Sequence, residues 1–239
     1  MNKQIFITGG AGGLGLEIAK RHLSLGDRVL VLDVEETSEV TDLLSKNDKI
    51  SFVKCDISRD AYVQEALKDI ATKIGKIDYF YSCAGIFSIE ERVPLPELNL
   101  DDAAPMYDIN AVGFLRVVQI LFDSLQDGSV VMCVTSEAGS LGECPRGEEF
   151  NYCMSKAAQN MACVLLQNHY DNVGLNIRVM CIHPGWMRTK MGGEDAAANP
   201  DRSIAPEVSA EAIIDIALDI ENIPKERMYM DYKRVDIAW

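Results

Sequence analysis

The chain has 239 residues, of which 48% are hydrophobic and 25% charged. This composition is typical of a folded protein with a sizeable core, and it excludes a chain that is disordered over most of its length. Lys and Arg number 23 against 37 Asp and Glu, so the formal net charge is −14. Such an acidic chain lacks the basic surface of a nucleic-acid-binding protein and would be repelled by anionic lipid, so we expect neither partner.

Seven cysteines are spread along the chain, and no two of them are spaced as CxxC. This pattern predicts reduced, mostly buried thiols rather than a disulfide framework or a metal site. The first residues, MNKQIFITGG, pass almost directly into a strand pattern, and no apolar stretch approaches the roughly 18 residues that span a bilayer. We therefore expect no signal peptide, no metal and a cytoplasmic location.

Short β-branched runs alternate with longer amphipathic ones along the whole chain. The predicted strands cover residues 4–8, 28–33, 50–56, 77–85, 129–136 and 176–185. The predicted helices cover residues 14–25, a charged segment ending near 45, and residues 61–74, 107–125 and 152–170. The strands are almost continuously apolar, as in a parallel sheet buried on both faces. We predict one α/β domain over residues 1–239, a Rossmann fold with a doubly wound parallel sheet of about seven strands and helices on both faces.

Two polar segments interrupt this alternation, GSLGECPRGEEF at residues 139–150 and KMGGEDAAANPDRSIAP at residues 190–206. Both follow predicted strands at their carboxyl ends, where open α/β sheets bind ligands. We expect residues 190–206 to form a lid over the substrate. In the first segment, Arg146, Glu148 and Glu149 either contact a polar substrate or belong to a solvated loop.

The sequence TGGAGGLG at residues 8–15 lies between the first predicted strand and the first predicted helix. Glycines at such a turn let the backbone approach a pyrophosphate, and the helix N-terminus offers unpaired N–H groups to it. Glycine loops also serve as simple turns, but this position favours dinucleotide binding. The absence of a following GK[ST] excludes a P-loop.

Asp33 ends the second predicted strand, 18 residues after Gly15. A carboxylate at this place accepts hydrogen bonds from the adenosine ribose hydroxyls and repels a 2′-phosphate. The loop at residues 9–15 also contains no Lys or Arg that would bind such a phosphate. Both features predict NAD rather than NADP. The alternative interpretation of Asp33 is that it is a surface residue in a turn and has no role in binding.

Tyr152 and Lys156 are four residues apart on a predicted helix, so both side chains lie on one face. A lysine ammonium beside a phenol favours the phenolate and lowers its pKa, which gives a proton donor or acceptor that works near neutral pH. Elsewhere such a pair is usually a solvated helix face. Its position after the fifth predicted strand, in a chain with a glycine loop, favours a catalytic pair.

These motifs, in this order, resemble those of the short-chain dehydrogenase/reductase family over essentially the whole chain. The family's motifs match Thr8, Gly9, Gly13 and Gly15 in TGxxxGxG, Ala84 and Gly85 in SCAG, Asn110 in DINAVG, Ser136 in VTS, Tyr152 and Lys156 in YCMSK, and Pro184, Gly185 and Thr189. The segments SEAGSLG and HPGWMRTKMGG and the residue Trp239 are similar to the C-factor and sniffer-like carbonyl reductases. Members of that group often use NADP, whereas Asp33 favours NAD.

The resemblance implies an NAD(H)-dependent oxidoreductase that interconverts a secondary alcohol and a ketone or aldehyde. It implies that Tyr152 is the general acid/base, that Ser136 hydrogen-bonds the reacting oxygen and that Lys156 holds the ribose and tunes Tyr152. Asn110 is implied to anchor a water in a proton relay. The implied cofactor contacts are Thr8, Gly9, Gly13, Leu14, Gly15, Asp33, Asp56, Ile57, Ala84, Gly85, Tyr152, Lys156, Pro184, Gly185 and Thr189.

The chain departs from the family pattern at Cys83, where the family has Asn, and in the spacing of 16 residues between Ser136 and Tyr152, which is longer than is common. His183 is predicted to be structural. One alternative function is a non-catalytic NAD-binding sensor on the same fold. A second is a sugar-nucleotide epimerase or dehydratase of the extended family, but the chain length and the glycine spacing weigh against it. The sequence identifies no substrate.

Family members commonly form dimers or tetramers through the two helices that correspond here to residues 107–125 and 152–170. The resemblance therefore implies a homodimer or homotetramer. The small side chains of Ala157, Ala158 and Ala162 are predicted to allow close packing between subunits.

Overall fold

The computed structural model describes residues 2–239, which form one seven-stranded sheet with the strand order β3-β2-β1-β4-β5-β6-β7. The strands are β1 (Gln4–Thr8), β2 (Arg28–Asp33), β3 (Ile50–Lys54), β4 (Tyr79–Ser82), β5 (Val130–Val134), β6 (Arg178–His183) and β7 (Tyr229–Asp231). All six neighbouring pairs are parallel. The strand order reverses between β1 and β4, which is where parallel sheets of this kind bind ligands.

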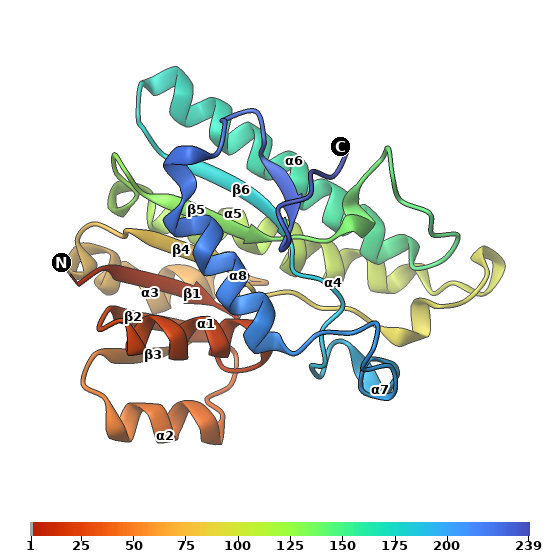
Figure 1. The fold of residues 1–239 in the computed structure, drawn as a ribbon, viewed down its shortest axis with the longest axis horizontal. Helices are drawn as coiled ribbons and strands as arrows, with labels where there is room; N and C mark the ends of the chain where they lie inside the picture. The colour runs from red at the N-terminus through yellow and green to blue at the C-terminus, as the bar shows by residue number, and fades with distance from the viewer. Residues whose placement is uncertain (1) are drawn as a thin grey trace.

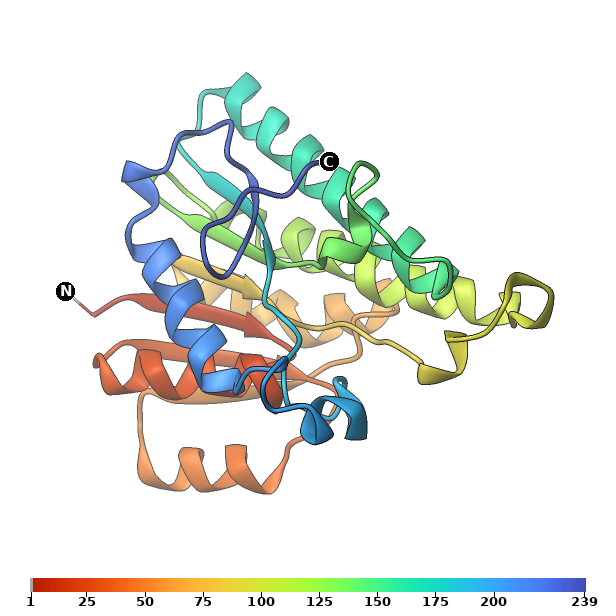
Figure 2. The same cartoon turned by 45° about the vertical axis from the view of Figure 1, so that its right-hand side comes forward.

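Helices cover both faces of the sheet, as Figures 1 and 2 show. They are α1 (Gly13–Ser24), α2 (Ser38–Lys46), α3 (Asp60–Ile74), α4 (Ala103–Tyr107), α5 (Gly113–Ile120), α6 (Phe150–Val173), α7 (Gly193–Ala198) and α8 (Pro206–Leu218). Helices α1 and α8 pack against each other on one face, and α3 packs against α5 on the other. The predicted doubly wound Rossmann fold is confirmed. Among residues 2–239, no helix is long and apolar enough to cross a membrane.

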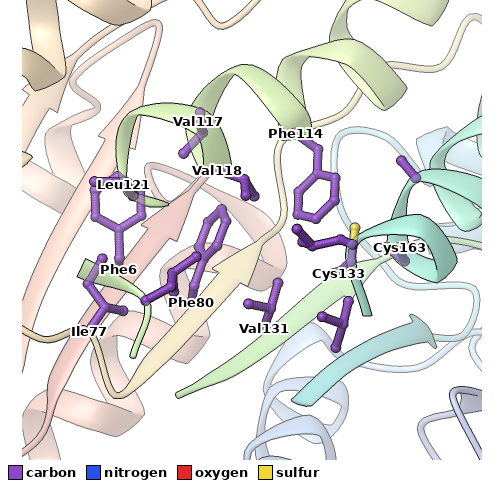
Figure 3. Close-up of a cluster of buried hydrophobic side chains, with 14 of the residues drawn as sticks. Phe6, Ile77, Phe80, Phe114, Val117, Val118, Leu121, Val131, Cys133 and Cys163 are labelled. Carbon is purple, nitrogen blue, oxygen red and sulfur yellow. The ribbon is translucent and has the colours of Figure 1, made fainter. Parts of the chain in front are cut away.

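Alternate side chains of each central strand enter opposite halves of the core, as the period of two in a strand requires. In β1, Ile5 and Ile7 pack in the cluster under α1 and α8, whereas Phe6 packs in the cluster under α5. Phe6 meets Phe80 edge to face at a centroid distance of 5.4 Å, and Phe80 stacks on Phe114 at 6.2 Å (Figure 3). Burial on both faces holds the carboxyl ends of the strands, and the loops that follow them, in fixed positions.

The helix predicted over residues 107–125 is interrupted in the structure. A π-helical turn, η4 (Asp108–Val112), lies between α4 and α5, and it turns Asn110 and Ala111 into the interior. π-Turns inside helices are frequent at functional sites. The helix predicted from Tyr152 begins two residues earlier, at Phe150.

Ala162 does not face a possible partner subunit, contrary to expectation. It is 6% exposed and packs in the core beside Cys163 of the same helix. The inward face of α6 passes through Ser155, Gln159, Ala162 and Leu166, so helical periodicity places this alanine inside.

Candidate active site

A cavity of about 1460 Å³ opens at the carboxyl ends of the central strands. Gly12 and Asp33 line one end of it, and Tyr152 and Ser136 line the other. Residues from the 190–206 segment, among them Asp195, line the cavity as well. Pockets for small ligands commonly have volumes of about 300–1,000 Å³, so this space is large enough for a dinucleotide together with a substrate.

The glycine loop has the geometry of a dinucleotide-binding turn. Gly9 has φ +66°, and a Cβ there would lie 2.6 Å from the backbone nitrogen of Ala84, so only glycine fits. Gly12 lines the cavity, and a Cβ there would meet no atom within 4 Å, so its free face is open. No side chain caps the N-terminus of α1. Its first-turn N–H groups are therefore suited to a pyrophosphate.

Asp33 lies at the end of β2 and is fixed by two backbone donors. Oδ2 accepts a hydrogen bond from the N–H of Ala11 at 2.9 Å, and Oδ1 accepts one from Val34 at 2.7 Å. Glu35 and Thr37 line the cavity beside it. The connection from β2 to α2 thus presents two carboxylates and no cation to this end of the cavity.

Tyr152 and Lys156 lie buried on α6, with Nζ of Lys156 5.8 Å from the centroid of the Tyr152 ring. Lys156 donates hydrogen bonds to the carbonyl of Val134 at 3.1 Å and to Oε1 of Gln159 at 2.8 Å. Burial lowers the pKa of Lys156 to about 8. Burial also raises the pKa of Tyr152 to about 12, against an opposing effect of hydrogen bonding to Ser136. In the protein alone, therefore, the loss of hydration outweighs the lowering expected from the lysine.

Asn110 lies behind the cavity wall and joins three segments. Its Nδ2 donates to the carbonyl of Ile86 at 3.0 Å and to Oγ of Ser155 at 2.9 Å, and its Oδ1 accepts from the N–H of Ile86 at 2.7 Å. Thr8 is also buried, and its Oγ1 donates to Oγ of Ser82 at 3.5 Å. Neither Asn110 nor Thr8 lines the cavity.

The other predicted site residues are brought together on the cavity wall. They are Gly9, Gly13, Leu14, Gly15, Asp33, Asp56, Ile57, Ala84, Gly85, Ser136, Tyr152, Lys156, Pro184, Gly185 and Thr189. They come from the carboxyl ends of six strands, β1 to β6, and from the loops and helices that follow, which the parallel sheet brings to one edge.

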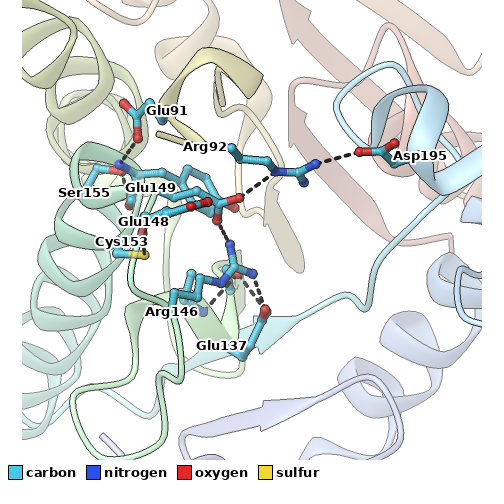
Figure 4. A network of polar contacts seen from close by, with 12 residues as sticks. Glu91, Arg92, Glu137, Arg146, Glu148, Glu149, Cys153, Ser155 and Asp195 are labelled. Atoms are coloured by element: carbon cyan, nitrogen blue, oxygen red, sulfur yellow. Dashed lines mark hydrogen bonds and ion pairs between the residues drawn. The ribbon is translucent and has the colours of Figure 1, made fainter. Parts of the chain in front are cut away.

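A chain of alternating charges crosses the mouth of the cavity (Figure 4). Asp195 accepts from Arg92 at 2.8 Å, and Arg92 donates to Glu149 at 2.9 Å. Arg146 then binds both Glu149 and Glu137. Sequence reasoning found Arg146 and Glu149 but missed the other three, and only the position of Glu137 beside Ser136 offered a signal.

Glu137 follows the predicted catalytic serine and contacts it directly. Oγ of Ser136 donates to Oε2 of Glu137 at 2.9 Å, and Nδ1 of His183 lies 2.8 Å from the same oxygen. Burial opposes the charge of Glu137, but His183 and Arg146 outweigh it and hold the pKa of this carboxyl well below its usual range. His183, predicted to be structural, therefore lines the cavity as part of this cluster.

The two tryptophans have different surroundings. Trp186 lines the cavity. Trp239 packs on the ring of Tyr229 at a centroid distance of 5.2 Å, and the hydroxyl of Tyr229 donates to the carbonyl of Ser136. The C-terminal segment thus supports the loop that carries the predicted catalytic serine.

The family model described as short chain dehydrogenase matches residues 3–200. The chain belongs to this family. The short-chain dehydrogenase is 30% identical to the C-signal protein of Myxococcus xanthus over 177 residues, which cover 72% of this chain and 100% of the relative. Its structure resembles the carbonyl reductase Sniffer of D. melanogaster, with a TM-score of 0.84 at 20% identity and complete coverage of both chains. It also resembles a short-chain dehydrogenase/reductase from Burkholderia multivorans with bound NADP, with a TM-score of 0.83 at 22% identity and complete coverage of both chains.

Proposed function

We propose that this short-chain dehydrogenase is an NAD(H)-dependent oxidoreductase that interconverts a secondary alcohol and a ketone or aldehyde. The observation that supports the proposal is the arrangement of one cavity, with Ser136, Tyr152 and Lys156 at one end and the glycine loop and Asp33 at the other. When bound, the nicotinamide ring supplies or accepts the hydride.

The protein's own residues orient the reactants and move the proton. Tyr152 exchanges a proton with the reacting oxygen of the substrate, and Ser136 forms a hydrogen bond to the same oxygen. Lys156 holds a positive charge behind the phenol, which reduces the cost of forming a phenolate in a buried site. Asn110 fixes the Ile86 backbone against α6 and so holds the cavity wall on the side of the reaction.

The segment 190–206 is proposed as the lid of this site. Several of its residues line the cavity, and the Arg92–Asp195 ion pair joins α7 to the opposite rim. An ion pair this exposed contributes little to stability. This contact between the lid and the opposite rim is thus easily broken and remade.

The preference for NAD is supported by charge at the adenosine end. A 2′-phosphate would face the carboxylates of Asp33 and Glu35. The Burkholderia multivorans structure contains NADP, but that protein is only 22% identical to this chain. The similarity therefore shows a shared fold and does not assign NADP to this chain.

Titration with NADH and NADPH tests the cofactor preference. We expect tighter binding of NADH, because hydrogen bonds from the ribose hydroxyls to a carboxylate are each worth about 1.5–3 kcal/mol. Asp33→Ala should weaken NADH binding by roughly 10-fold or more while reducing the discrimination against NADPH. Tighter binding of NADPH by the unaltered protein would overturn the preference.

NADH oxidation against ketones, aldehydes, acyl-thioester ketones, steroids and keto-sugars tests the reaction. We expect turnover with at least one class, and its loss in Tyr152→Phe with NADH binding retained, because that variant lacks only the proton-transferring hydroxyl. Full activity in Tyr152→Phe would contradict the proposed mechanism.

A further inference from the structure

The glycine loop offers backbone N–H groups to a pyrophosphate but no cation. Residues 8–15 contain no Lys or Arg, and the positive end of a helix dipole amounts to about half an elementary charge. Both phosphates of a dinucleotide are ionised at neutral pH, so their charge exceeds what this helix end balances. Asp33 and Glu35 line the same cavity and add further negative charge. A cation from another segment would therefore strengthen binding of the phosphates.

Most cations that line the cavity are already engaged. The Lys and Arg residues on its wall are Arg92, Arg146, Lys156, Lys190 and Arg202. Arg92 and Arg146 bind carboxylates, and Lys156 is buried with two hydrogen-bond acceptors. Lys190 and Arg202 are exposed, and within residues 2–239 neither side chain forms an ion pair or a hydrogen bond. Both belong to the proposed lid.

The backbone at Lys190 lies beside the N-terminus of α1. A Cβ on Gly13, the first residue of that helix, would lie 3.3 Å from Cγ2 of Thr189. The turn that follows has its own hydrogen bonds. The N–H of Gly192 donates to Oγ1 of Thr189 at 3.3 Å, and the N–H of Gly193 donates to the carbonyl of Lys190 at 3.3 Å. Lys190 therefore brings a cation next to the glycine loop.

Arg202 lies toward the other end of the lid. It follows α7, and its N–H donates to the carbonyl of Asn199 at 3.1 Å. Asp195 of α7 pairs with Arg92 across the cavity at 2.8 Å. This part of the lid is therefore joined to the rim that carries Arg92, at the mouth of the cavity.

We propose that Lys190 binds the pyrophosphate of the dinucleotide and supplies the cation that the glycine loop lacks. The inference rests on the proposed function only in placing a dinucleotide in this cavity, and it applies to NAD and NADP alike. Because Lys190 is the first residue of the lid, the same contact ties the lid to the bound cofactor. It adds to the Arg92–Asp195 ion pair, which joins α7 to the opposite rim.

Equilibrium binding of three ligands tests the inference without turnover. NADH and ADP-ribose contain the pyrophosphate, whereas adenosine has the same base and ribose and no phosphate. Lys190→Gln should weaken binding of NADH and of ADP-ribose by about five- to tenfold, because a charge-assisted hydrogen bond from an exposed side chain is lost. Adenosine has no group for this lysine to bind, so its affinity should not change. Isothermal titration calorimetry measures all three.

Two further variants test whether the charge at this position is responsible. Lys190→Arg keeps the charge and should bind ADP-ribose more tightly than Lys190→Gln does. Lys68→Gln removes a positive charge from an exposed position of α3, away from the cavity, and should leave all three affinities unchanged. Weakening of equal size in Lys68→Gln would overturn the inference, because net charge rather than a contact would then determine binding.

Amide hydrogen exchange tests the tie between the lid and the cofactor. At saturating ADP-ribose, exchange in residues 190–206 should slow in the unaltered protein and slow less in Lys190→Gln. Equal slowing in both proteins would overturn this part of the inference.

An ADP-ribose affinity that is unchanged in Lys190→Gln overturns the pyrophosphate contact. So does an equal loss of adenosine affinity, because the substitution would then have altered the cavity as a whole. Failure of the unaltered protein to bind NADH and ADP-ribose would overturn the proposed cofactor site together with this inference. The turnover assay bears on the proposed reaction separately, since none of these measurements requires a substrate.

Discussion

Lys156 is a charged side chain enclosed by the protein, and its stabilising contacts are few. Its ammonium has two recorded acceptors, the carbonyl of Val134 and Oε1 of Gln159, while burial lowers its pKa to about 8 from the usual 10.5. A lowered lysine pKa means that the charged form is destabilised in the folded state. Residues that serve a reaction often reduce stability in this way.

This produces a pH-dependent stability with a defined sign. Between pH 8 and 10.5 the unfolded chain binds the proton that the folded protein has lost, so this residue's contribution to stability rises with pH. From pH 7 to 9.5, the free energy of unfolding of the unaltered protein should increase by about 2 kcal/mol relative to that of Lys156→Met. Urea unfolding of both proteins measures the difference, and parallel pH dependences would contradict it.

At the scale of residues, the sequence could predict groups that belong to local motifs. Tyr152 and Lys156 are one helical turn apart, and Asp33 ends a strand, so periodicity alone places them. The environment of Glu137 could not be predicted in the same way, because Arg146 and His183 reach it from separate elements.

At the scale of elements, the N-terminus of α6 is stabilised by a neighbouring turn rather than by its own cap. Glu149, the N-cap residue, has φ 61° and makes no side-chain cap. Oε2 of the buried Glu91 instead accepts from the N–H of Tyr152 at 3.0 Å. The Glu91 carboxylate therefore caps α6 from the neighbouring turn η1 (Ile89–Glu91). Its negative charge also interacts favourably with the positive, N-terminal end of the helix dipole.

Replacing this external cap should weaken the helix that carries the proposed catalytic pair. We expect Glu91→Ala to lower the free energy of unfolding by about 1–2 kcal/mol, since the buried hydrogen bond that caps the helix is lost. Glu90→Ala, at the exposed position beside it, should change stability by less than about 0.5 kcal/mol. Thermal or chemical unfolding compares them, and equal losses in both variants would refute the capping role.

Regular elements could be predicted from the sequence more fully than irregular ones. The central strands are continuous apolar runs, whereas β7 has only three residues and shows no pattern of its own. The π-turn at Asn110 was also missed, because the residues on both sides continue a helical periodicity. The turn η1 depends on contacts with α6, about 60 residues away along the chain, for which no local pattern exists.

At the scale of the whole molecule, an apolar surface lies along α5 and α6. Met154, Met161 and Leu165 of α6 are 62%, 57% and 61% exposed, and Leu115 of α5 is 41% exposed. In a protein with net charge −14, such a cluster is more consistent with a subunit interface than with a free surface. We therefore still predict a homodimer or homotetramer, and we expect its subunits to meet through these side chains of α5 and α6.

Light scattering should give a mass of two or four chains. Leu165→Glu should shift the population toward monomers, because a charge would be buried in the interface. Tyr62→Glu, at an exposed position of α3, is the matched control and should leave the mass unchanged. A monomeric unaltered protein would contradict the prediction.

The separate positions of the two tryptophans make the protein its own fluorescence reporter. Trp186 lines the cavity, so its emission should be quenched when a reduced nicotinamide, which absorbs in that range, is bound nearby. Trp239 lies on Tyr229 behind the loop of Ser136, and its emission follows the packing of that loop. The variant Trp239→Phe keeps Trp186, whose emission reports filling of the cavity. The variant Trp186→Phe keeps Trp239, whose emission reports the order of the loop that carries Ser136.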